Sequence, residues 1–162
     1  MESPNIGAPS RRRCSASQGQ GRNFAPAADR PISSGAGERI LIVEDDFLVA
    51  SQMEAALVED GFEIAGVAST GKEAVQLAEA QCPTLVVMDV RLLGDRNGID
   101  TALELFRLHG LRCIFASAHF DDDTRRRAAP AAPLGWLQKP YTMASLTAMV
   151  RAGFKELRSR QV

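Results

Sequence analysis

The sequence has few cysteines, few aromatic residues and no long apolar run. Its three cysteines, Cys14, Cys82 and Cys113, are irregularly spaced, so we predict neither a disulfide framework nor a cysteine-rich metal site. No uninterrupted apolar stretch approaches the roughly 20 residues that a helix needs to cross a bilayer, and we expect no membrane span. The formal net charge of -1 gives no general attraction to nucleic acid or to an anionic membrane. These absences favour a soluble protein of the reducing cytoplasm whose partners bind at a local site.

Two parts of the chain differ in composition. Residues 1–37 are rich in Ser, Gly, Ala, Pro and Arg and lack hydrophobic periodicity, which predicts a disordered tail. The run Arg11–Arg13 could indicate an export signal, but no apolar segment follows it, so a solvated basic tail is the preferred interpretation. Residues 38–160 have the apolar content of one folded domain, and a chain of 162 residues is too short for two ordinary domains.

From Arg39 onward, short apolar runs alternate with segments of helical periodicity, which is typical of parallel βα units. The five strands are predicted at 40–43, 64–68, 84–88, 113–116 and 134–137. A helix is predicted after each strand, and Pro130 and Pro133 should keep the fourth helix short. The predicted fold class is therefore α/β, with a parallel five-stranded sheet covered by helices on both faces.

Polar side chains follow four of these strands. Glu44 and Asp45 come after the first strand, Asp89 after the third, Ser117 after the fourth and Lys139 after the fifth. Ligands of an open parallel sheet bind outside the carboxyl ends of its strands, so we expect these side chains to meet in one crevice. The neighbouring Asp46 is interpreted as a helix cap.

Three carboxylates drawn together repel one another and require a cation, and a set of oxygen ligands favours Mg2+. We expect Asp45 and Asp89 to bind the ion directly and Glu44 to reach it through water, which leaves one Asp89 oxygen as a nucleophile. Ser117 and Lys139 would then bind the remaining oxygens of a phosphoryl group. The alternatives are that the acidic triplet only caps a helix and that Ser117 only satisfies backbone groups.

With these residues in place, the folded part of the sequence resembles the receiver domain of bacterial two-component response regulators. The motifs that carry the resemblance stand in the family's order and at similar intervals: Ile40-Leu-Ile-Val-Glu-Asp-Asp46, Val86-Val-Met-Asp-Val-Arg-Leu92, Phe115-Ala-Ser-Ala118 and Leu137-Gln-Lys-Pro140. The resemblance implies a flavodoxin-like (βα)5 sandwich with strand order 2-1-3-4-5. It also implies phosphotransfer to Asp89 from a histidine kinase or a histidine phosphotransfer protein.

The resemblance further assigns roles to single residues. The backbone carbonyl of Arg91 is implied as a metal ligand, and the Lys139–Pro140 peptide is implied to be cis. Ser117 and Trp136 correspond to the pair that carries the conformational switch, although receivers usually have Tyr or Phe where Trp136 stands. The side chains of Arg91 and His119 correspond to positions that tune the lifetime of the phosphorylated state, and a solvated loop role is equally open for both.

The sequence ends after the last predicted helix, so we expect a stand-alone receiver that does not bind DNA directly. The signal would pass to an unknown downstream protein through the face formed by the fourth helix, the fifth strand and the fifth helix; homodimerisation is left open. The chain is expected to be a phosphoacceptor with at most slow self-dephosphorylation, not an enzyme. The alternatives are a phosphate sink, a pseudo-receiver scaffold and a Mg2+-dependent aspartyl-phosphate hydrolase. Arg91 argues against the hydrolase, because haloacid dehalogenases carry a second Asp there.

Overall fold

The computed structural model describes residues 37–160. The predicted tail, residues 1–37, lies outside this part of the chain apart from Gly37. The elements in chain order are β1 (Arg39–Val43), α1 (Phe47–Glu59), β2 (Glu63–Ala68), α2 (Gly71–Gln81), β3 (Leu85–Asp89), α3 (Gly98–His109), β4 (Cys113–Ser117), α4 (Asp122–Ala128), the 3-10 helix η1 (Ala129–Ala131), β5 (Gly135–Gln138) and α5 (Met143–Ser159).

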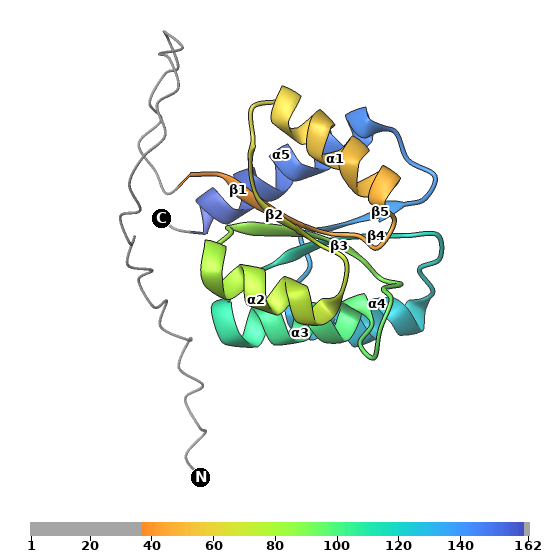
Figure 1. Ribbon diagram of the computed structural model, residues 1–162. Helices are drawn as coiled ribbons and strands as arrows, with labels where there is room; N and C mark the ends of the chain where they lie inside the picture. Colours follow the sequence, from red (N-terminus) through yellow and green to blue (C-terminus); the bar gives the residue numbers. More distant parts are fainter. Residues whose placement is uncertain (1–36, 161–162) are drawn as a thin grey trace, which may run out of the picture.

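The strands form one five-stranded sheet in the order β2-β1-β3-β4-β5, and all four neighbouring pairs are parallel. Figure 1 shows α1 and α5 covering one face of this sheet and α2, α3 and α4 covering the other. Both the predicted α/β class and the predicted strand order are confirmed. The order reverses between β1 and β3, so the carboxyl ends of these two strands border the crevice where a doubly wound sheet binds its ligand.

The core is divided by the sheet into two layers. Residues of β1 alternate between them: Leu41 and Val43 pack toward α2 and α3, whereas Ile40 and Ile42 pack toward α1 and α5. All four side chains have 0% exposure, which explains why the strand is an unbroken apolar run without polar alternation. Because Ile40 to Val43 are buried on both faces, the first polar side chain that follows them stands at the carboxyl end of β1.

Helix starts follow the caps that the sequence provides. Asp46, Thr70 and Thr142 each accept a backbone N–H of the first turn, of α1, α2 and α5 respectively. Asn97 and Asp121 do the same for α3 and α4. The structure therefore confirms that Asp46 is a cap.

Two strands are displaced by one residue from their predicted positions. β3 runs to Asp89 and begins after Thr84, because the Thr84 hydroxyl accepts the Arg39 N–H at 3.0 Å and ties the loop to the start of β1. β5 begins at Gly135, one residue after the predicted Leu134. The predicted short fourth helix is confirmed, since α4 has seven residues and gives way to η1, which contains Pro130.

Candidate functional site

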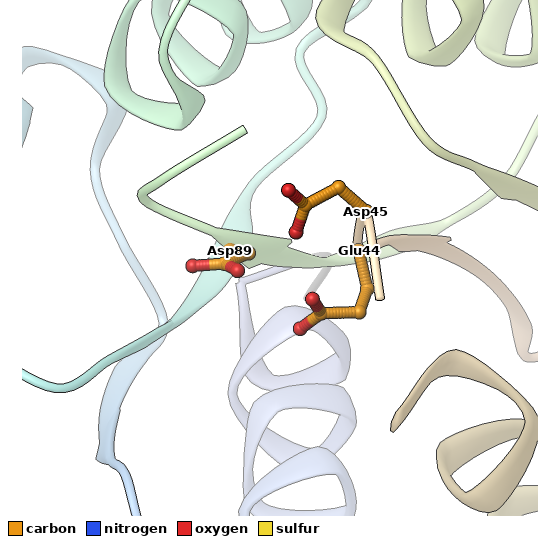
Figure 2. A group of neighbouring side chains, drawn as sticks. All are labelled: Glu44, Asp45 and Asp89. Carbon is orange, nitrogen blue, oxygen red and sulfur yellow. The ribbon is translucent and has the colours of Figure 1, made fainter. Parts of the chain in front are cut away.

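Three carboxylates lie together where β1 and β3 end. Glu44 is 3% exposed, Asp89 is 7% exposed, and Asp45 is half-buried between them and solvent. One carboxylate oxygen from each residue lies within 4.8 Å of the other two. Figure 2 shows the side chains of Glu44 and Asp45 extending toward that of Asp89. The expected convergence of the ends of β1 and β3 is therefore seen in the structure.

Lys139 brings a positive charge into this group. Its Nζ donates to Glu44 Oε2 at 3.0 Å and to Asp89 Oδ2 at 3.1 Å. The lysine follows the edge strand β5, and its backbone N–H donates to the Ser117 carbonyl at 2.8 Å, which aligns the ends of β4 and β5. The Lys139–Pro140 peptide is cis, as the resemblance implied. Lys139 thus bridges the two most buried carboxylates of the site.

Burial and charge act in opposite directions on this pair. Burial raises the pKa of Glu44, against the hydrogen bonds from Lys139 and the Asp46 N–H, which favour the carboxylate. Burial also lowers the pKa of Lys139, but its hydrogen bonds to Glu44 and Asp89 outweigh this effect and leave the pKa raised. Lys139 therefore stays a cation at neutral pH and partly offsets the repulsion among the carboxylates.

Ser117 lies at the end of β4 and is 4% exposed. Its Oγ donates to the His119 carbonyl at 3.0 Å and accepts the His119 N–H at 3.3 Å. The hydroxyl thus satisfies backbone groups of the loop after β4, which was the alternative interpretation from sequence. To donate to a group on Asp89, the Ser117 hydroxyl would have to give up its hydrogen bond to the His119 carbonyl.

The remaining predicted residues stand after β3, after β4 and on β5. Arg91 donates its backbone N–H to Asp89 Oδ1 at 3.0 Å and orients that carboxylate, whereas its side chain is exposed. The side chain of His119 is also exposed. Trp136 is half-buried on β5 and stacks on Phe115 of β4, with ring centroids 4.7 Å apart. The predicted roles of Arg91 as a carbonyl ligand and of Arg91 and His119 in tuning stay predictions.

Gly98 is a residue of the site that the sequence analysis missed. It begins α3, and a Cβ built on it would lie 1.9 Å from the carbonyl oxygen of Asp89. Its N–H donates to the Val90 carbonyl at 2.9 Å. The absence of a side chain therefore lets α3 start against the backbone of Asp89. The dipeptide Asn97–Gly98 was the only signal in the sequence, and by itself it indicates a turn.

The donor set suits a divalent cation that prefers oxygen ligands. Three carboxylates and one ammonium group leave two negative charges when all are ionised, and one divalent ion balances them. The ligating atoms are carboxylate oxygens without nitrogen or sulfur, which favours Mg2+ over zinc. Glu44, Asp45 and Asp89 therefore fit the predicted metal site.

Within residues 37–160, no helix combines the length and the apolar character that a bilayer crossing requires.

Comparison with known proteins gives a consistent result. Residues 40–151 match the model of the response regulator receiver domain. The transcriptional regulatory protein PdtaR of Mycobacterium tuberculosis is 35% identical over 120 residues, which cover 74% of this chain and 58% of that protein. The phyllosphere-induced regulator PhyR of Methylorubrum extorquens is 30% identical over 131 residues, which cover 80% of this chain and 48% of PhyR. The chain thus spans only about half the length of these two regulators.

Solved structures agree with this assignment. The signal receiver domain of a modulated diguanylate cyclase from Desulfovibrio desulfuricans superposes with a TM-score of 0.70 at 30% identity, covering 77% of this chain and 99% of that domain. A CheY-like receiver domain from Methanospirillum hungatei superposes with a TM-score of 0.71 at 21% identity, over 77% of this chain and 99% of the other, and supports the fold alone. From the family match, the sheet order and the acidic site together, we conclude that this chain belongs to the response regulator receiver domain family of two-component signalling.

Proposed function

We propose that Asp89 accepts a phosphoryl group from a phosphohistidine, carried by a histidine kinase or a histidine phosphotransfer protein. The single observation that supports this best is the position of Asp89, which is 7% exposed, bonded to Lys139 and within 4.8 Å of two further carboxylates. Burial of a carboxylate among other acids is costly for folding, so we take the cluster as a site for a cation and for an anionic group that arrives with it. Reversible phosphorylation would require both.

In the reaction, the P–N bond of the donor histidine breaks and a P–O bond forms to one carboxylate oxygen of Asp89. Mg2+ would supply the charge that brings an anionic phosphoryl group to an anionic nucleophile. Glu44, Asp45 and Asp89 would hold the ion, with the Arg91 carbonyl as a further ligand. The Arg91 N–H, at 3.0 Å from Asp89 Oδ1, keeps the nucleophilic carboxylate in a fixed orientation.

Lys139 would then follow the charge that is transferred. Before transfer its ammonium group is shared between Glu44 and Asp89. After transfer, a phosphoryl oxygen on Asp89 would be its strongest acceptor, because the carboxylate of Asp89 loses its charge on forming the acyl phosphate and the phosphoryl group carries more negative charge than that carboxylate did. Ser117 would bind another phosphoryl oxygen after leaving the backbone of His119.

The phosphorylated domain would pass its signal on by protein contact at the face formed by α4, β5 and α5, without binding DNA itself. The phosphoryl group would bias an equilibrium between two conformations, and the downstream protein would recognise one of them. We further propose that the chain acts as a phosphoacceptor and not as a turnover enzyme. Arg91 stands two residues after Asp89, where an aspartyl-phosphate hydrolase would need its acid.

The test is incubation of the full chain with acetyl phosphate and Mg2+, followed by intact-mass measurement. We expect a gain of one phosphoryl group in the wild type and in Asp46→Asn, and none in Asp89→Asn. Asp46→Asn is the matched control, because Asp46 is a nearby exposed acid that only caps α1 and Asn caps a helix equally well. An unmodified wild type would leave the protein-binding scaffold as the better account. Continued release of phosphate with catalytic turnover, lost in Asp89→Asn, would favour the hydrolase.

A further inference from the structure

A cation and two aromatic rings meet beside the fifth strand. The guanidinium carbon of Arg125, on α4, lies 5.5 Å from the ring centroid of Phe120 and 5.5 Å from that of Trp136. The two rings meet edge to face, with centroids 5.4 Å apart and planes at 64°. We call this group of three side chains, Phe120, Arg125 and Trp136, the Arg125 latch. Nothing in the sequence pattern indicated it.

The latch adds to the attachment of α4, which the buried Ala128 also anchors. This helix has seven residues, and Ala128 is its single buried side chain. Figure 1 shows α4 as the last member of the helix layer that α2 and α3 begin. A short helix with so little apolar burial has a low intrinsic stability, so a side-chain contact to the rest of the domain can bias its position. Arg125 provides that contact across the loop and onto β5.

The latch is also connected to the phosphorylation site by bonded neighbours. Ser117 Oγ holds both backbone groups of His119, and Phe120 is the next residue in the chain. Withdrawal of the Ser117 hydroxyl toward a phosphoryl group on Asp89 would release His119 and with it the backbone that positions the Phe120 ring. In the described structure the hydroxyl is turned to the loop, so the latch belongs to the state without a phosphoryl group.

We propose that the Arg125 latch holds α4 in its unphosphorylated position and that phosphorylation of Asp89 opens it by withdrawing Ser117 from His119. This inference rests on the proposed function, because it requires a phosphoryl group at Asp89. It assigns to Phe120 and Arg125 a positioning role in this chain, in addition to the pair formed by Ser117 and Trp136. Phosphorylation would thereby free the guanidinium group and α4 together on the face that meets the downstream protein.

Thermodynamic linkage gives the test a definite sign. A contact made only in the unphosphorylated state lowers the affinity for any ligand that binds preferentially to the phosphorylated conformation. Removal of the contact must therefore raise that affinity. Beryllofluoride with Mg2+ is the probe, because it occupies the place of a phosphoryl group without covalent chemistry. From the usual strength of an exposed cation–π contact, we expect Arg125→Gln to bind it roughly two- to fivefold more tightly than the wild type.

Arg127→Gln is the matched control. Arg127 is an exposed arginine of the same helix without an aromatic ring beneath it among the described residues, so its removal changes the net charge equally. Calorimetric titration of the full chain should give the wild-type affinity for Arg127→Gln and an increased affinity for Phe120→Leu. The emission of Trp136, the only tryptophan, should change on beryllofluoride binding in the wild type and change less in Arg125→Gln.

The outcomes separate the two proposals. If the wild type and Arg125→Gln bind beryllofluoride equally well, the latch proposal is wrong while the proposed function stands. Weaker binding by Arg125→Gln would place the contact in the phosphorylated state and would also overturn the latch proposal. A purely structural Arg125 would lower the stability to urea without changing this affinity. If even the wild type does not bind beryllofluoride with Mg2+, the proposed function fails, and the latch falls with it.

Discussion

Replacement of Gly98 by alanine should disrupt the acceptor site by displacing backbone, not by removing a functional group. The new Cβ would lie 1.9 Å from the Asp89 carbonyl oxygen, 2.8 Å from its carbonyl carbon and 2.9 Å from the Val90 Cα. All three atoms belong to the main chain, so no rotamer change relieves the overlap. To increase the distance of the closest pair from 1.9 Å to even 3.0 Å, α3 and the end of β3 would have to move apart by at least 1.1 Å.

Gly98→Ala should destabilise the protein, although helix propensity alone would predict that it stabilises the protein. Alanine in place of glycine in a helix would by itself stabilise the protein by up to about 1 kcal/mol. Overpacking of a tightly packed position typically costs about 1–3 kcal/mol and more when backbone must shift. We therefore expect Gly98→Ala to lower the free energy of unfolding by about 3 kcal/mol. A displacement of about 1 Å at Asp89 should also weaken beryllofluoride binding by about 100-fold.

Urea denaturation and beryllofluoride titration in Mg2+ test this prediction. Gly66→Ala is the control, because the Cβ added there would meet Leu77 Cδ1 at 3.1 Å, and a leucine side chain can move away. We expect that variant to lose less than about 1 kcal/mol and to keep its affinity. A Gly98→Ala protein that is as stable as the wild type and binds beryllofluoride equally well would refute the close approach of α3 to Asp89.

Three further predictions concern single side chains. Lys139→Ala leaves the buried carboxylates of Glu44 and Asp89 without their cation, so it should lower the unfolding free energy by about 2 kcal/mol in EDTA. Millimolar Mg2+ should recover most of this loss, because the metal ion would replace the missing positive charge. Equal losses with and without Mg2+ would contradict the prediction that Lys139 and Mg2+ act on the same carboxylates. Asp46→Ala removes the acceptor of two N–H groups of α1 and should cost about 1 kcal/mol in urea denaturation while phosphorylation by acetyl phosphate is unchanged. Burial raises the pKa of Cys113 to about 12, so its thiolate fraction at pH 8 is about one in ten thousand; peptide mapping after iodoacetamide treatment should find Cys113 unmodified in the native protein and modified in urea.

Much of the site could be predicted from the sequence because burial fixes where strands end. The part of β1 that is covered on both faces, Ile40 to Val43, has no polar residue, and the first one after it is Glu44. Glu44 and Asp89 therefore had to lie at the carboxyl edge once the apolar runs before them were identified as parallel strands. The same reasoning placed Lys139 after β5, and its ion pairs to Glu44 and Asp89 agree with that placement.

The features that escaped prediction depend on contacts between segments whose relative position no local pattern sets. Gly98 lies against Asp89 only because the start of α3 packs in space against the end of β3. In the sequence, the glycine has the pattern of an ordinary turn residue. Arg125 on α4 lies over Phe120 of the preceding loop and Trp136 of β5, a contact that depends on how α4 packs beside β5. The orientation of the Ser117 hydroxyl toward His119 likewise reflects competition between two partners, which residue type alone does not decide.

The most direct test of the account is to locate the modified residue. The wild-type chain would be incubated with acetyl phosphate and Mg2+, reduced with borohydride, which converts an aspartyl phosphate to homoserine, and mapped by tandem mass spectrometry. We expect homoserine at position 89 and nowhere else, with no conversion when EDTA replaces Mg2+. Conversion at Asp45 or Asp46 with Asp89 unmodified, or conversion at Asp89 that persists in EDTA, would contradict it.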